Sequence, residues 1–179
     1  MSDPFRWRYG RVDRFFIGAI GPPGQRTFYL YLETASERAY FPFEKNQAKV
    51  MGEQSLELAA NLGWEGDSPA VQEIVAQGTD LPTPLSETEI LFRVSAISMR
   101  IDAEEEITMM LEGQSEEKVT FTITPRQLQA GAYMALQACR SGRPICRDCQ
   151  PGGPGSTVGS MDKGTFILGS VAAGRSHSK

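Results

Sequence analysis

The sequence is poor in the residues on which nucleophilic catalysis and metal binding most often depend, since its 179 residues include one histidine and three cysteines. A serine or cysteine triad needs a histidine beside its nucleophile, and the only histidine, His177, lies in a polar segment far from any strong motif. An odd number of cysteines, without a recognisable secretory signal, favours a reducing compartment. We therefore expect a cytoplasmic protein that does not use a catalytic triad.

Long apolar runs are also absent. The strongest candidate, Phe15–Ile20, is much too short to cross a bilayer and continues into Gly21-Pro22-Pro23-Gly24. That glycine-proline segment lacks the Lys-Ser/Thr ending of a phosphate loop, so it predicts a hairpin turn. We expect no membrane association.

Positive charge is missing from the middle of the chain. Residues 51–90 hold eight Asp and Glu and no Lys or Arg, whereas residues 1–50 and 141–179 carry an excess of Lys and Arg. The formal net charge of -4 argues against a nucleic-acid-binding protein. We interpret the uneven distribution as charge complementarity within the molecule, and the alternative is a single anion-binding surface formed by the two basic ends.

The hydrophobic periodicity divides the chain into two similar halves. Residues 1–63 predict three strands and a helix, and residues 88–149 predict the same order. The expected strands are 14–20, 26–33 and 38–43 in the first half and 89–102, 106–112 and 118–123 in the second, and the expected helices are 45–62 and 124–141. Both helices begin with a polar cap and a glutamine three residues later, Gln47 and Gln127. This similarity suggests an internal duplication.

We therefore predict an α+β protein made of two strand-strand-strand-helix halves, which form antiparallel sheet with a helix packed on each half. Residues 1–149 are expected to form a single domain, in which an acidic connector, 64–87, joins the halves as a surface loop with a short helix. Residues 150–179 are rich in Gly, Pro and Ser and predict a flexible tail, with one short strand at 165–168.

Several segments together resemble a bacterial family known only as domain of unknown function 3090. The resemblance covers about residues 9–149 and rests on Asp13-Arg14-Phe15, Gly21–Phe28, Glu44–Gln47, Phe92-Arg93-Val94, Thr124–Gln127 and Gly142–Cys149. Members of this family usually continue after the last cysteine with a second segment that contains His and Cys, so the resemblance implies a small zinc knuckle. In this chain residues 150–160 contain neither His nor Cys.

Cys146 and Cys149 have the spacing of half a zinc site, and tetrahedral zinc needs four ligands. Cys139 and His177 are the remaining candidate ligands, and zinc is the one cofactor that the sequence suggests. The alternatives are a metal shared with a partner, a redox-active dithiol, or reduced structural cysteines, which we favour. Cys139 is expected to pack inward as a small apolar side chain near the end of a helix.

The function that we predict is a non-enzymatic binding or adaptor protein that contacts a protein partner through the cysteine knuckle and the tail. One alternative is a small hydrolase or transferase that acts on a phosphorylated substrate, with Arg26 and Arg93 as anion ligands. A second is a nucleic-acid module that uses the N-terminal stretch of alternating arginines and aromatics, although a strand explains that alternation equally. The candidate anion or partner contacts are Arg6, Arg8, Arg26, Arg93, Arg143 and Arg147.

Overall fold

The computed structural model describes residues 7–22, 24–141 and 165–168. The first half contains strands β1 (Trp7–Arg11), β2 (Arg14–Ile20), β3 (Thr27–Glu33) and β4 (Arg38–Phe43) and helix α1 (Lys45–Asn61). The connector contains helix α2 (Pro69–Gln77) and a 3-10 turn, η1 (Glu87–Glu89). The second half contains β5 (Ala96–Ile101), β6 (Ile107–Glu112), β7 (Lys118–Ile123) and helix α3 (Pro125–Arg140), followed by β8 (Thr165–Leu168).

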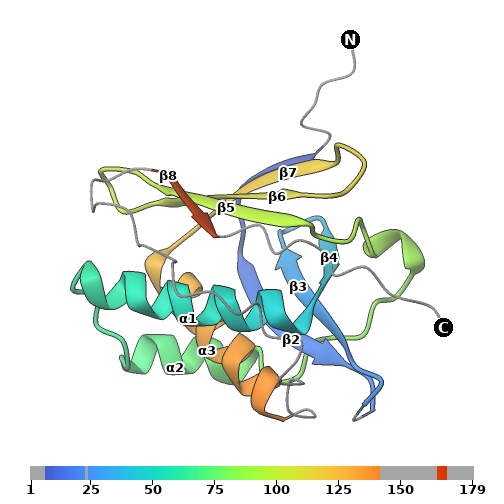
Figure 1. Ribbon diagram of the computed structural model, residues 1–179, viewed down its shortest axis with the longest axis horizontal. Coiled ribbons are helices and arrows are strands. Elements are labelled where there is room, and N and C mark those ends of the chain that lie inside the picture. Colours follow the sequence, from blue (N-terminus) through green and yellow to red (C-terminus); the bar gives the residue numbers. More distant parts are fainter. Residues whose placement is uncertain (1–6, 23, 142–164, 169–179) are drawn as a thin grey trace, which may run out of the picture.

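The strands form two separate sheets. The larger sheet has the order β1-β7-β6-β5-β8 and the smaller one the order β2-β3-β4. Figure 1 shows the larger sheet above helices α1, α2 and α3, with the smaller sheet to the right. The predicted α+β class with largely antiparallel pairing is confirmed, and the exception is β1, which runs parallel to β7.

The sequence pattern was misleading at one strand. The expected strand 89–102 is wrong in length, because η1 ends at Glu89 and β5 begins only at Ala96. The intervening chain changes partners: the Val94 N–H bonds to Pro42 of β4, whereas the Ser95 N–H bonds to Glu112 of β6. A continuous apolar run therefore contains two separate pairing segments.

The strand predicted at 165–168 is present as β8 and pairs antiparallel with β5. These four residues lie within the segment for which the sequence predicts a flexible tail, and they form one edge of the larger sheet.

The main core lies between the two sheets and helices α1 and α3. Along β5, β6 and β7, buried residues alternate with partly or fully exposed ones, as expected for a sheet with one solvated face. The smaller sheet is instead buried on both faces. Its second face carries Phe16, Tyr31 and Tyr40, which pack with Val71 of α2 and Met134 of α3. The connector thus covers an aromatic surface, which is more packing than a surface loop would provide.

Each half contributes one extended segment, here called an arm, that pairs with a strand of the other half. The first arm is β1, which pairs parallel with β7, and the N–H of Val12 then bonds to the carbonyl of Thr122. The second arm is residues 90–94, which runs parallel to β4 through a bridge between Ile90 and Tyr40 and the bond from Val94 to Pro42. The two arms occupy equivalent positions in the two halves. Val12 bonds to the penultimate residue of β7, and Val94 bonds to the penultimate residue of β4.

Helices α1 and α3 begin in the same way, as their sequences predict. The side-chain oxygens of Gln47 and Gln127 accept the N–H of Glu44 and of Thr124, at 2.8 and 2.9 Å. The amide nitrogen of Gln127 also donates to the carbonyls of Val12 and Asp13, and that of Gln47 donates to the carbonyls of Val94 and Ser95. Each buried glutamine therefore fixes both the start of its helix and the point where an arm enters a sheet. The repeated pattern supports the hypothesis of internal duplication.

Candidate functional site

A cleft of about 390 Å³ lies where the β2–β3 turn, the start of α1 and the second arm meet. Phe28 and Phe43 are among the residues that line it, and both are buried. Its charged residues are Arg26, Glu44, Lys45 and Arg93. The fold thus brings together the two arginines for which the sequence predicts anion binding, although they are far apart in the chain.

Within the described part of the chain, each of these two arginines donates one side-chain hydrogen bond. Arg26 donates from Nη1 to the carbonyl oxygen of Ser141 at 3.3 Å, just beyond the end of α3. Arg93 donates from Nη1 to Oε1 of Glu44 at 2.7 Å. A guanidinium group carries five N–H donors, so both side chains retain donors for a ligand in the cleft.

The carboxylate of Glu44 is the counter-charge of this site. The side chains of Arg93 and Glu44 remain 53% and 62% exposed, so their ion pair is screened by water. Such surface pairs stabilise a fold by about 0–1 kcal/mol. An anion with more charge than a carboxylate can therefore compete with Glu44 for Arg93.

The residues of the second half that correspond to the cleft, together with Arg11 of the first arm, carry a different set of charges. Arg11 of the first arm corresponds to Arg93, but the helix cap that corresponds to Glu44 is the neutral Thr124. The residue before β6 is Glu106, whereas the residue before β3 is Arg26. The clustering of cations is therefore specific to this cleft and does not follow from the repeated fold.

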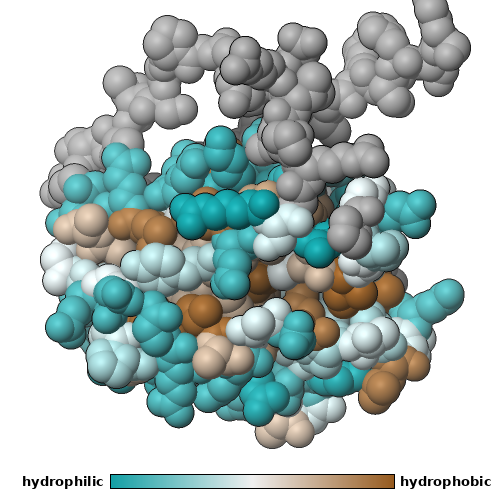
Figure 2. Space-filling view, turned by 90° about the horizontal axis from the view of Figure 1, so that it is seen from below, coloured by the Kyte–Doolittle hydropathy of each residue, from teal (hydrophilic) through white to brown (hydrophobic). Residues whose placement is uncertain are grey.

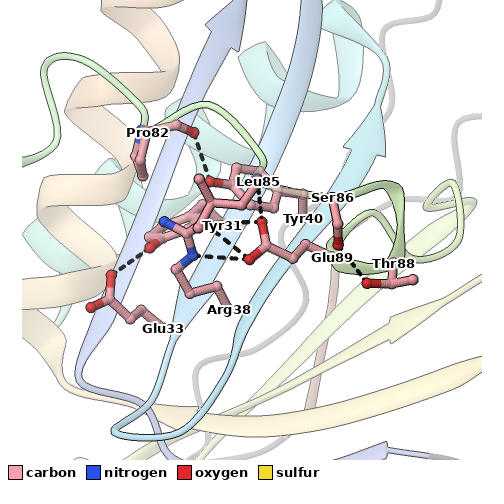
Figure 3. Close-up of polar contacts among 9 residues, drawn as sticks. All are labelled: Tyr31, Glu33, Arg38, Tyr40, Pro82, Leu85, Ser86, Thr88 and Glu89. Atoms are coloured by element: carbon pink, nitrogen blue, oxygen red, sulfur yellow. Dashed lines mark hydrogen bonds and ion pairs between the residues drawn. The ribbon is translucent and has the colours of Figure 1, made fainter.

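A second polar cluster fastens the connector to the smaller sheet (Figure 3). Arg38 of β4 forms a forked ion pair with the carboxylate of Glu89, with N–O distances of 3.0–3.2 Å. Glu89 also accepts the N–H of Leu85 at 2.8 Å, and the hydroxyl of Tyr40 donates to the carbonyl of Pro82 at 2.6 Å. We call residues 79–89 the strap, because these bonds tie it across the aromatic face.

The tyrosines beneath the strap are structural. Tyr31 and Tyr40 are fully buried, with ring centroids 4.9 Å apart, and the Tyr31 hydroxyl donates to Glu33. Burial, followed by the hydrogen bond to Glu33, raises the pKa of Tyr31 above its ordinary value. A hydroxyl that holds its proton in this way is a hydrogen-bond donor and not a base.

Of the other predicted site residues, two lie in the described part of the chain. Arg8 is exposed on β1, whereas its neighbour Tyr9 packs against the main core, as in an ordinary strand. Cys139 packs partly buried against the core, and its thiol donates to the carbonyl of Lys45 at 3.6 Å. Burial raises the pKa of this thiol, which disfavours the thiolate that a metal ligand or nucleophile requires.

The remaining predicted residues lie outside the described ranges, namely Arg6, Arg143, Cys146, Arg147, Cys149 and His177. Within those ranges, no three His, Cys, Asp or Glu side chains are grouped so that they could hold a metal ion. Zinc binding by the cysteine knuckle therefore stays a prediction.

The sequence analysis predicted two of the four charged residues of the cleft and missed the other two. Glu44 and Lys45 were interpreted only as the start of a helix, and their role in the cleft depends on the second arm, which brings Arg93 to them. The only available signal was the repeated Arg-Val pair of the two arms, Arg11-Val12 and Arg93-Val94.

The visible face in Figure 2 carries side chains of mixed hydropathy. Figure 2, which views the molecule from below, shows hydrophobic groups separated by hydrophilic side chains. None of the helices in the described part of the chain combines the length and apolar character that a membrane crossing requires.

A family model described as "Protein of unknown function (DUF3090)" matches residues 7–157. No curated protein and no solved structure matches the chain.

Proposed function

Since this chain belongs to the DUF3090 family of proteins of unknown function, we propose a function from its own cleft: it binds a small phosphorylated ligand. The phosphoryl group is held between Arg26, Lys45 and Arg93. The observation that carries this proposal is the convergence of these three cations, from a turn, a helix start and an arm, on one cleft.

The chemistry of the cleft suits a phosphoryl group. Arginine presents its donors in a planar fork that matches phosphate oxygens, and lysine adds a compact point charge. Lys45 is also the first residue of a helix of 17 residues, whose dipole adds positive potential at this end. The cleft volume lies within the range of small-molecule sites.

Binding is proposed here without a catalysed reaction. A hydrolase or transferase would need a base or nucleophile beside the phosphoryl group. Among the described residues that line the cleft, Glu44 is the only carboxylate, and it is paired with Arg93. The phosphate-binding proposal does not depend on a catalytic role of Glu44.

The direct test is a titration of the protein with inorganic phosphate at constant ionic strength, followed by amide chemical shifts in NMR spectra. We expect shifts at residues of the β2–β3 turn and the start of α1, and at least a tenfold loss of affinity in Arg26→Ala and Arg93→Ala. Arg11→Ala is the matched control, because Arg11 occupies the equivalent arm position outside the cleft. Equal loss in Arg11→Ala, or no saturable binding, would refute the proposal.

An adaptor role through the cysteine knuckle and the tail is a separate proposal. The chain leaves the described part of the structure at Ser141, beside Arg26, and the knuckle follows in sequence. Because β8 belongs to the larger sheet, a deletion of residues 150–179 would also remove an edge strand. The suitable variants are a deletion of residues 169–179 and the double substitution Cys146→Ser and Cys149→Ser. Unchanged capture of the native partner by both variants would exclude this role, and zinc content measured on untagged protein tests the metal.

A further inference from the structure

We infer that the cleft is coupled to the C-terminal end of α3, residues 138–141, and that a phosphorylated ligand bound to Arg26 loosens this end. This inference rests on the proposed function and concerns the regulation of the same site. It follows from two contacts that join the end of α3 to residues of the cleft.

The end of α3 touches two residues that line the cleft. Nη1 of Arg26 donates to the carbonyl oxygen of Ser141 at 3.3 Å. The thiol of Cys139 donates to the carbonyl oxygen of Lys45 at 3.6 Å, and Cys139 itself packs partly buried against the main core. None of residues 138–141, all of which the structure describes, lines the cleft. The end of α3 therefore adjoins the site from behind, and a ligand in the cleft does not cover it.

In the free protein Arg26 acts as a cap for α3. The last carbonyl groups of a helix have no partner within it, and an arginine side chain can supply one. These carbonyls form the negative end of the helix dipole, equivalent to roughly half an elementary charge, so a cation beside them stabilises the last turn. The N–H and the hydroxyl of Ser141 both donate to the carbonyl of Gln137. The carbonyl of Ser141 depends instead on Arg26, which comes from a distant part of the chain.

A phosphoryl group in the cleft competes for this cap. Its oxygens are charged, whereas the carbonyl of Ser141 is neutral, so the guanidinium group of Arg26 is attracted more strongly to the ligand. Even if Arg26 keeps its bond to Ser141, the negative charge of the ligand cancels part of the positive charge that stabilises the end of α3. Both effects loosen the last turn. Because coupling between sites is reciprocal, the intact turn also weakens the binding of the ligand.

The coupling gives the ligand an effect outside the cleft. The chain runs from Ser141 into the segment that contains Cys146 and Cys149. A ligand that loosens the end of α3 acts on the residue from which this segment starts. The proposed ligand site and the predicted cysteine knuckle are thereby linked through the main chain.

The test is amide hydrogen exchange, measured by NMR at constant pH and ionic strength, with and without saturating inorganic phosphate. The N–H of Ser141, which bonds to the carbonyl of Gln137 at 3.1 Å, reports on the end of α3. We expect its exchange to become about two- to fivefold faster when phosphate binds, which is the range that a charge at a helix terminus can account for. The N–H of Leu62, which bonds to the carbonyl of Leu58 at the end of α1, is the internal reference and should not change.

Two variants separate the loss of the cap from the loss of affinity. Arg26→Ala and Arg93→Ala each remove one cation of the cleft, but Arg26 contacts Ser141 whereas Arg93 contacts Glu44. At equal occupancy by phosphate, Arg93→Ala should keep the faster exchange at Ser141. Arg26→Ala should show fast exchange without the ligand and little further change with it.

The outcomes separate the coupling from phosphate binding, because amide shifts at the start of α1 report binding in the same spectra. If these shifts saturate but the exchange of Ser141 is unchanged or slower, the coupling is refuted and phosphate binding stands. The same conclusion holds if exchange at Leu62 rises equally, or if phosphate has its full effect on Ser141 in Arg26→Ala. If no shift saturates, both proposals fail.

Discussion

Two buried glutamines hold the points where the arms enter the sheets. Gln127 makes three polar contacts, with the N–H of Thr124 and with the carbonyls of Val12 and Asp13. Removal of a buried partner leaves groups without a hydrogen bond, and each such group costs about 1–3 kcal/mol. We expect Gln127→Ala to lower the free energy of unfolding by about 2–4 kcal/mol in urea titrations. Gln137→Ala, on the exposed side of the same helix, should change it by less than about 0.5 kcal/mol.

A glycine in α3 allows the helix to approach β2. A Cβ at residue 131 would lie 2.6 Å from Cε1 of Phe15, whereas a Cβ at Gly10 of β1 would meet no atom within 4 Å. The overlap costs about 1–3 kcal/mol, and the higher helix propensity of alanine returns up to about 1 kcal/mol. Gly131→Ala should therefore reduce the unfolding free energy by about 1–2 kcal/mol. Calorimetry that shows Gly131→Ala to be as stable as Gly10→Ala would contradict this packing argument.

At the scale of the element, the strap depends on one carboxylate. The N–H of Leu85 and then Arg38 lower the pKa of Glu89, against an opposing effect of burial. A lowered pKa means that the stabilisation is present above the unfolded value of about 4.3 and is lost as the pH falls through the folded value. We expect the stability difference between wild type and Glu89→Gln to be constant from about pH 5.5 to 7 and to shrink below about pH 4. Urea midpoints measured between pH 3 and 7 would show this, and a difference that does not change with pH would exclude the ionic role.

The elements differed in how far the sequence could predict them. Helix α3 was evident because Thr124-Pro125 and Gln127 combine a cap, a proline at the first position and a capping box. The second arm was not, because Ile90 to Val94 read as a continuation of β5, and only the distant β4 reveals their pairing. The cleft was equally hard to predict, because it includes a residue of the second arm. Arg26 and Arg93 could be named as candidates, but their meeting with Glu44 depends on that arm.

For the molecule as a whole, the exchanged arms imply that neither half is complete alone. β1 belongs to the first half of the chain but forms the edge of the second half's sheet, and helices α1 and α3 pack so closely that a Cβ at Gly52 would touch Leu136. We expect a single cooperative unfolding transition, with coincident curves from far-ultraviolet circular dichroism and from the fluorescence of the two tryptophans, Trp7 of β1 and Trp64, which packs against the main core. Two separate transitions would show that the halves are independent domains.

The parallel pairing of β1 with β7 also constrains folding during synthesis. Trp7 pairs with Val119, so β1 leaves the ribosome before its partner and cannot form this pairing until residues 118–123 have been made. At ordinary rates of translation this delay lasts about 5–20 s. During that interval the arginines of β1 keep an unpaired strand charged, which discourages it from pairing with another nascent chain.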